Sequence, residues 1–359
     1  RITAKATVTS GVSPTGALQN PSWNYDVSGR VTGLACDQTL SASVIAGAPF
    51  FTMGNLCLGS LSKVTVGPLE VRGSLTVAAD ATIGLLGTPI SRADVAAGCS
   101  GHLCSSVDHV FATTITQTVP AMTPPTADWD YWYSNAAPGP KHACDVSTGT
   151  PPTFDNNSLR DKSVATVFSL TPATSYTCRV GPVGNPTGEL SWDATTKVLT
   201  IRGTVFIDGQ AKIDNGQVDT YQGQGVIYTQ GSFAVANGSK MCAVVSGTDC
   251  DFTPGAWDPS QKLLAIASNG SGGIGVLAGN GVQLGCLDRL QGVIFATNAV
   301  QITGGAASAK HQGAIVASTI ILAAAAELKP LPALTTVPRG LPGQSSGNTR
   351  IAPPTDFTG

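Results

Sequence analysis

The chain repeats a fourteen-residue pattern in which a glycine is followed by two short runs of alternating apolar residues. Five segments carry this pattern; they begin at Gly67, Gly203, Gly225, Gly292 and Gly313. Two positions after the glycine stand Leu69, Val205, Ile227, Ile294 and Ile315. Eight and ten positions after it stand Leu75 and Val77, Ala211 and Ile213, Phe233 and Val235, Val300 and Ile302, and Ile321 and Ala323. Since alternate residues of a strand face the same side, each segment predicts two strands whose apolar residues stack into one interior.

The sixth position of the pattern predicts a turn between the two strands. It holds Gly73, Gly209, Gly231, Asn298 and Thr319, and four of these five residues tolerate a left-handed backbone. The preceding position is always polar and holds Arg72, Asp208, Gln230, Thr297 and Ser318. This polar column predicts an exposed corner.

The spacing of the repeats favours a solenoid over the main alternative, a β-sandwich. The glycines at 203 and 225 are 22 residues apart, and those at 292 and 313 are 21 apart. Such a period is typical of stacked coils, whereas alternating strands alone would also fit a sandwich. The sequence therefore predicts an all-β parallel β-helix with coils of about 21–22 residues.

The pattern also divides the chain. Residues 1–95 are expected to form irregular N-terminal coils, and residues 191–328 the main solenoid, entered through a hairpin over 189–203. Residues 96–190 are rich in Pro, Ser and Thr and break the pattern, which predicts an inserted lobe stapled by disulfides. Residues 329–359 are Pro-rich and predict an extended tail, either a strap along the solenoid or an arm to a neighbour.

Composition narrows the possible partners. Lys and Arg number 20 against 22 Asp and Glu, so there is no basic field for nucleic acid. No apolar run reaches the roughly 20 residues that cross a bilayer. The chain starts at Arg1 without a signal peptide, and we expect it to be a mature or trimmed form.

The nine cysteines predict disulfides and an oxidising compartment. The candidate pairs are Cys36 with Cys57, Cys99 with Cys104, Cys144 with Cys178, and Cys242 with Cys250. Cys286 is left over and is expected to be a buried free thiol. Zinc is the alternative at "CSGHLC" (99–104), but no second ligand pair lies nearby in the sequence.

One column of aromatic residues is expected to point away from the core. Phe206, Tyr228 and Phe295 would form an apolar patch that needs a cover. The favoured interpretation is that the 96–190 lobe or the tail covers it; the alternatives are a sugar-stacking platform or a subunit interface. The interface candidates are therefore Phe206, Tyr228 and Phe295, with Pro338 and Phe357 in the tail.

Residues that could carry catalysis are scarce. Asp155, Asp208, Asp214 and Asp219 form no evident carboxylate pair, which a glycoside hydrolase would need. His102, His109, His142 and His311 form no metal-spaced pair. We therefore predict no catalytic residue, no metal site and no cofactor, and expect that the protein is not an enzyme; a polysaccharide-active β-helix enzyme is the least favoured alternative.

From Tyr133 onward the chain resembles a family of bacterial, mostly actinobacterial, pilus-assembly-like (PilX-like) surface proteins. The segments that carry the resemblance include "GELSWDATTKVLTIRGTVFIDG", "YQGQGVIYTQGSF", "MCAVVSGTDCDF" and "WDPSQKLLAIASNG". Members often carry a type IV prepilin-like hydrophobic segment ahead of a β-rich domain. The resemblance implies an extracellular, surface- or pilus-associated structural role, and it brings no catalytic residues.

Together these features predict an extracellular structural protein that builds or decorates a cell-surface filament. The expected partners are further copies of the chain, joined through solenoid edges or the tail, or other pilus subunits. The alternative is a glycan-binding adhesin that uses Trp129, Tyr131, Trp132 and Tyr133, although these rings would also serve to anchor the lobe to the solenoid.

Overall fold

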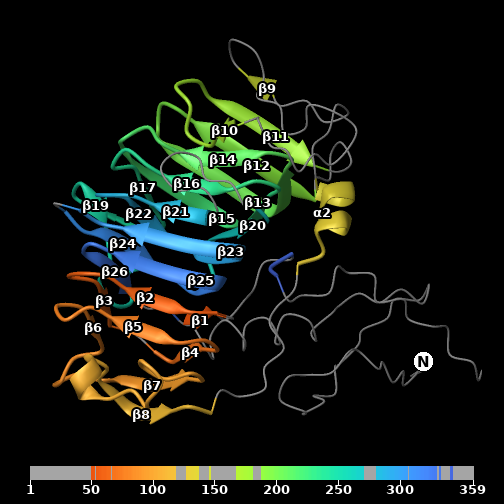
Figure 1. Ribbon diagram of the computed structural model, residues 1–359. Coiled ribbons are helices and arrows are strands. Elements are labelled where there is room, and N and C mark those ends of the chain that lie inside the picture. Colours follow the sequence, from red (N-terminus) through yellow and green to blue (C-terminus); the bar gives the residue numbers. More distant parts are fainter. Residues whose placement is uncertain are drawn as a thin grey trace, which may run out of the picture.

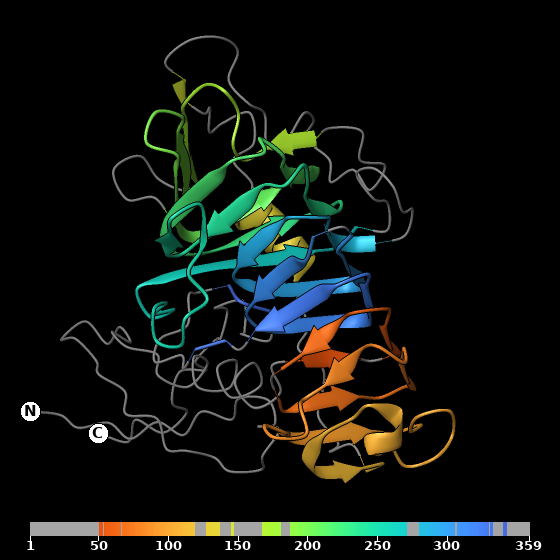
Figure 2. The ribbon, with the colours of Figure 1, turned by 90° about the vertical axis from the view of Figure 1, so that its left-hand side faces the viewer.

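The computed structural model describes residues 50–52, 54–65, 67–118, 127–136, 145–146, 167–180, 187–270, 280–305, 307–329, 331–332 and 340–342. Within these ranges the regular secondary structure is almost entirely β, with one short α-helix, α2 (Trp129–Ala136), and one 3-10 turn, η1 (Ser106–Asp108). Most strands are parallel and pile up into a solenoid with three stacks of strands, seen from two sides in Figures 1 and 2. This is the all-β parallel solenoid that the repeat predicted.

The first stack carries the residues that directly follow each leading glycine. In spatial order it contains β13 (Val198–Ile207), β15 (Val218–Thr229), β20 (Lys262–Ser268), β23 (Val293–Thr303), β25 (Ile315–Ala323), β1 (Phe50–Thr52), β4 (Leu69–Val71), β7 (Ile90–Val95) and β8 (Ala112–Thr116).

The second and third stacks complete each coil. The second contains β10 (Val167–Ser169), β14 (Gln210–Ile213), β16 (Phe233–Val235), β21 (Asn280–Leu284), the later halves of β23 and β25, β2 (Leu56–Leu58) and β5 (Leu75–Val77). The third contains the beginnings of β13 and β15, then β17 (Lys240–Cys242), β22 (Arg289–Gln291), β24 (Ala309–Gln312), β26 (Ala326–Lys329), β3 (Lys63–Val64) and β6 (Thr82–Ile83).

The coils do not stack in sequence order. The last coil of the C-terminal part pairs with the first described coil of the N-terminal part: Ile315 lies opposite Phe50, and Ile320 opposite Leu56. β26 likewise pairs with β3. The strands from β1 to β8 therefore extend the far end of the solenoid built by the strands from β13 to β26, and Figure 1 shows them as orange strands below the blue ones.

Antiparallel strands close the opposite end. β12 (Gly188–Asp193) pairs with β13 from Gly188 opposite Gly203 to Asp193 opposite Val198, which confirms the predicted hairpin over 189–203. β11 (Tyr176–Val180) pairs with β12 on one side and with β9 (Asp145–Val146) on the other. A small hairpin of β18 (Val245–Ser246) and β19 (Asp249–Cys250) projects from the third stack.

The first predicted apolar column is present and buried. Its members, in spatial order and each 0% or 1% exposed, are Val205, Ile227, Ile266, Ile294, Ile315, Phe50 and Leu69. Gly203 lies opposite Gly225 and Ile294 opposite Ile315, but Gly225 lies opposite Leu264 and Phe50 opposite Leu69. The near-22-residue spacing is thus the register between some neighbouring coils, while other coils carry loops or are shorter.

The second column needs one correction. The register between β23 and β25 shifts after Ala296, so Ile320 and Leu322, not Ile321 and Ala323, lie opposite Val300 and Ile302. Ile320 and Leu322 are buried, and Ile321 and Ala323 are half-buried on the outside. A one-residue slip moves every side chain to the other face, and alignment on the glycine could not detect it.

The predicted exposed corner is also wrong in part. Asp208 and Gln230 are only 5% and 4% exposed, although each directly follows a strand, β13 or β15, at a corner of its coil. None of the five turn residues at the sixth position has a positive φ. The need for glycine there is steric: a Cβ on Gly73 would lie 2.5 Å from the carbonyl oxygen of Gly54 in the adjacent coil.

The predicted 96–190 lobe is not one unit. Residues 96–118 form the terminal coil, since β8 pairs with β7, Cys99 bridges to Leu75 and Val110 bridges to Ile83. The strands β10, β11 and β12, within residues 167–180 and 188–193, instead belong to the opposite end. The Pro- and Ser-rich composition hid these short strands because each has only a few paired residues.

The leading glycines are sites of close backbone approach. A Cβ on Gly313, whose φ is +144°, would lie 1.6 Å from the carbonyl oxygen of Gly292, the leading glycine of the neighbouring coil. A Cβ on Gly225 would lie 2.7 Å from the carbonyl oxygen of Gly203, the leading glycine of its neighbouring coil. At Gly225, Gly292 and Gly313 the column therefore marks a close approach of neighbouring coils, which explains why glycine recurs there.

Candidate functional site

The aromatic column of the first stack is covered by the chain itself. Phe206 and Tyr228 are 0% exposed and Phe295 is 8% exposed. Helix α2 lies against this stack (Figure 1). The Tyr228 hydroxyl donates a hydrogen bond to the carbonyl oxygen of Gly340 at 2.7 Å, so the C-terminal region also contributes to the cover.

Three rings of α2 make the contact. Trp132 stacks on Tyr228 with ring centres 5.8 Å apart, and Trp129 meets the same tyrosine edge-on at 5.1 Å. Tyr133 meets Phe206 edge-on at 5.5 Å. Burial raises the pKa of Tyr228, so its hydroxyl stays protonated and serves as a donor.

These contacts decide between the interpretations of both aromatic groups. The cover favoured from the sequence exists, and the interface role of Phe206, Tyr228 and Phe295 is withdrawn because a partner cannot reach them. Trp129, Trp132 and Tyr133 anchor α2, and Tyr131 packs edge-on against Trp132 at 4.9 Å. The remaining interface candidates, Pro338 and Phe357, lie outside the described residues.

Two predicted disulfides are present, Cys99–Cys104 and Cys242–Cys250. Cys178 is disulfide-bonded, while its predicted partner Cys144 lies outside the described residues, as does Cys36. Cys57 is a free thiol, which corrects its predicted pairing: its neighbours in the adjacent strands are Thr76 and Ile321. Cys286 is free as predicted but exposed, since it lies at a coil corner.

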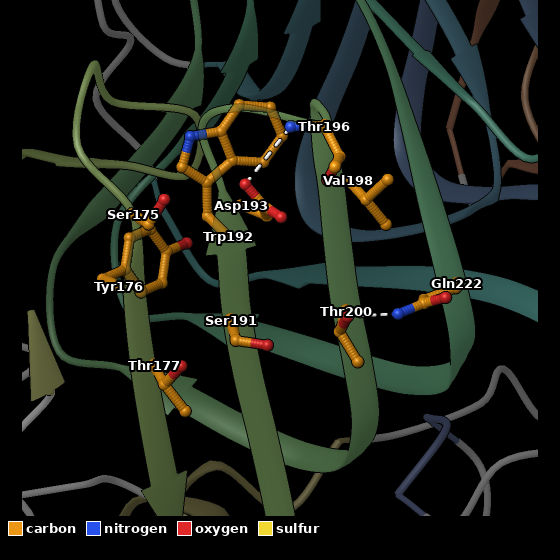
Figure 3. Close-up of a pocket in the computed structure, with 10 residues that line it drawn as sticks. All are labelled: Ser175, Tyr176, Thr177, Ser191, Trp192, Asp193, Thr196, Val198, Thr200 and Gln222. Atoms are coloured by element: carbon orange, nitrogen blue, oxygen red, sulfur yellow. Dashed lines mark hydrogen bonds between the residues drawn. The ribbon is translucent and has the colours of Figure 1, made fainter. Parts of the chain in front are cut away.

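A groove of about 850 Å³ lies over the antiparallel end of the solenoid (Figure 3). Its lining comes from β11, β12, β13, β15 and the adjoining turns; the residues are Ser175, Tyr176, Thr177, Ser191, Trp192, Asp193, Thr196, Val198, Thr200 and Gln222. Thr177, Ser191, Thr200 and Gln222 lie side by side in register across four strands. The sequence analysis did not identify this row, because its members are far apart in the chain and chemically ordinary.

The groove offers hydrogen-bonding groups beside a similar amount of apolar surface. The Gln222 amide donates to the Thr200 hydroxyl at 2.8 Å. Asp193 accepts hydrogen bonds from the backbone amides of Thr195 and Thr196, and hydrogen bonds to this turn lower its pKa. Tyr176 and Trp192 are 2% exposed, so their rings cannot stack against a ligand. The arrangement suits a neutral ligand rich in hydroxyl or amide groups.

The candidate carboxylates are dispersed. Asp214 pairs with Lys212 at 2.5 Å, and Asp219 is buried and accepts a hydrogen bond from Asn215 at 2.7 Å. Asp208 is buried at its corner, and Asp155 lies outside the described residues. Asp208, Asp214 and Asp219 therefore do not form a common site.

A carboxylate pair that the sequence analysis missed lies on the outer side of the first stack. Glu70 and Asp94 are opposite one another in β4 and β7 and are 6% and 1% exposed. Asp94 pairs with Arg92 at 2.7 Å, and burial, reinforced by the Asp94 charge, raises the pKa of Glu70. Only the register of strands 24 residues apart in sequence could have revealed this pair.

His311 lies in the core of the third stack, between Leu290 and Leu328 in the neighbouring strands. It is 0% exposed, and neither ring nitrogen has a hydrogen-bond partner in the described part of the chain. Burial lowers the pKa of its imidazole to about 3, against the smaller opposing effect of nearby backbone groups. His311 therefore packs as a neutral side chain.

Replacing His311 by leucine is expected to make the protein less sensitive to acid. The folded pKa of His311 lies below the unfolded value of about 6.5, so its contribution to stability is fully present above that value and is lost as the pH falls toward 3. The loss is about 1.4 kcal/mol per pH unit. Urea unfolding at pH 7 and pH 4 should show the difference between wild type and His311→Leu shifting by about 3 kcal/mol in favour of the variant at pH 4.

Asp288 has the opposite effect on the pH dependence of stability. Burial raises the pKa of its carboxyl to about 6, so its contribution to the stability of the fold is lost as the pH rises through that value. Because Asp288 is present in both wild type and His311→Leu, its effect cancels in the stability difference between them. An identical difference between wild type and His311→Leu at the two pH values would contradict the buried neutral imidazole.

In the described part of the chain, no helix is long and apolar enough to cross a membrane, and no three His, Cys, Asp or Glu side chains gather as metal ligands. No family model, no curated protein and no solved structure matches the chain.

Proposed function

We propose that the protein is an extracellular structural protein that builds or decorates a cell-surface filament and associates with further copies of itself. The observation that carries this proposal is an open end of the solenoid. β8 pairs with β7 on one side, and no strand in the described ranges pairs with its other side. Such an edge is a template for pairing with another chain.

Two further features support the proposal. Disulfides at Cys99–Cys104 and Cys242–Cys250 are compatible with an oxidising, extracellular compartment. The stacked coils form a rod with continuous hydrogen bonding between neighbouring strands, which suits a mechanical role (Figure 2). The resemblance to pilus-assembly-like surface proteins points to the same setting.

The proposal is tested by measuring where the protein lies in the cell and what mass it has in solution. Intact cells that express the full-length protein are treated with a membrane-impermeant biotin reagent, and the purified chain is measured by light scattering over a range of concentrations. We expect surface labelling and a mass above that of one chain. A monomer at every concentration would overturn the self-association, and labelling only after cell lysis would overturn the extracellular location.

A second candidate function, glycan binding, is favoured by the row of hydroxyl and amide side chains in the groove. The row of Thr177, Ser191, Thr200 and Gln222 can donate to and accept from sugar hydroxyls. Titration calorimetry with neutral oligosaccharides should give binding that the Thr177→Val/Thr200→Val double variant loses. No heat of binding, or binding unchanged in the double variant, would remove this candidate.

A further inference from the structure

We propose that two copies of this chain join through their β8 strands, antiparallel and related by a two-fold axis, so that two solenoids form one rod with a capped end on each side. This inference rests on the proposed self-association and specifies its geometry as a closed pair, which fits a protein that decorates a filament rather than one that builds it. It follows from the different construction of the two ends of the solenoid.

The free edge of β8 is able to pair. The Ile90 amide donates to the carbonyl oxygen of Phe111 at 3.0 Å, and Ile90 lies opposite Ala112. In a parallel ladder alternate residues point their backbone groups to opposite sides, so those of Ala112 and Thr114 point away from β7. Backbone donors and acceptors left without partners favour pairing.

The sequence of β8 does nothing to block such pairing. Edge strands of monomeric proteins are usually protected by lysine, proline or a bulge. β8 reads ATTIT, with no charge and no proline, and four of its five residues are β-branched. Two such strands can meet antiparallel without like charges facing each other.

The terminal coil is held in place before any partner binds. The Cys99–Cys104 disulfide closes its first turn, and the Ser105 side chain caps η1, where Asp108 completes a capping box. The Thr116 hydroxyl donates to Asp94 at 3.0 Å and so ties the end of β8 to β7. A preorganised edge loses less entropy on association than a frayed one.

The opposite end cannot receive β8. There β12 occupies the outer edge of β13 in six antiparallel pairs, and β11 covers β12. Head-to-tail stacking would need a free parallel edge on the first stack at this end, and the hairpin removes it. Two identical open edges can instead satisfy one another in a closed two-fold contact.

Apolar side chains gather near the open end. Seven large hydrophobic side chains are exposed in the described ranges, and four of them lie in the last two coils: Leu85, Leu86, Leu103 and Val107. Leu86 and Val107 are each 85% exposed. A second copy would cover part of this surface, whereas a monomer leaves it in water.

The test is cross-linking at the proposed contact. In the full-length chain Cys36, Cys57 and Cys286 are changed to serine, and Thr114→Cys is added in β8. A matched control carries Thr195→Cys, which is exposed at the capped end. Mild oxidation and a short bis-maleimide should each convert the Thr114→Cys protein to covalent dimers and leave the Thr195→Cys protein monomeric. The Thr114→Cys/Thr195→Cys double variant should stop at dimers.

A second pair of variants tests whether association needs the backbone amide of residue 114 in β8. Thr114→Pro removes the outward amide and should give a monomer by light scattering, while Thr114→Val keeps the amide and should associate as the wild type does. Association of the wild type without Thr114→Cys dimers, or a ladder of larger products from the double variant, would overturn the two-fold contact and leave self-association standing. A monomeric wild type would overturn both.

Discussion

Replacing Gly313 by alanine is expected to lower the free energy of unfolding by about 3–5 kcal/mol, from overpacking together with backbone strain. The new Cβ would lie 1.6 Å from the Gly292 carbonyl oxygen, which belongs to the backbone of the neighbouring coil and cannot rotate away as a side chain can. The φ of +144° is also unsuited to alanine. Urea unfolding followed by circular dichroism measures the change.

Gly87→Ala is the matched control. A Cβ at this position would meet no atom within 4 Å, and Gly87 has no positive φ. Its free energy of unfolding should stay within about 0.5 kcal/mol of the wild type. Equal effects at Gly87 and Gly313 would contradict the explanation of the leading glycines as points of contact between coils.

Replacing Trp132 by alanine is expected to destabilise the fold by about 3–5 kcal/mol, the range for loss of a large buried aromatic side chain. Trp132 is 7% exposed and stacks on Tyr228, so its removal leaves a cavity and opens the aromatic column to water. Thermal unfolding should show a lower Tm, and the dye 1-anilinonaphthalene-8-sulfonate should bind the variant under native conditions.

Ser134→Ala is the control on the same helix. Ser134 is exposed and its hydroxyl bonds to the Asp130 carbonyl oxygen within α2, so this change leaves the aromatic contact intact. If Trp132→Ala matched the control in Tm and dye binding, α2 would not be the cover of the first stack.

The sequence predicted the structure best at positions where a single physical requirement determines the residue type. Ile227, Ile294 and Ile315 recur because an interior column of stacked strands requires apolar side chains in register. Cys99 with Cys104, and Cys242 with Cys250, pair within short turns, so their proximity in sequence predicts their bond.

The sequence predicted the structure least well where strand register, or a contact between segments far apart in the chain, determines which residues are neighbours. The shift after Ala296 exchanges Ile321 for Ile320, and nothing in the local pattern marks it. The contact of Ile315 with Phe50 joins segments at opposite ends of the described chain, and a repeat read in sequence order predicts a different neighbour. The groove and the Glu70–Asp94 pair are assembled across strands in the same way and were missed for the same reason.

Electron cryo-microscopy of the purified, undenatured full-length chain tests the central claim, self-association through the open solenoid end, most directly. We expect rods made of two solenoids joined at the coils of residues 96–118, with the antiparallel hairpins of β11 and β12 at the two outer ends. Separate single solenoids at concentrations where the protein is abundant, or particles joined through the hairpin end, would contradict the account.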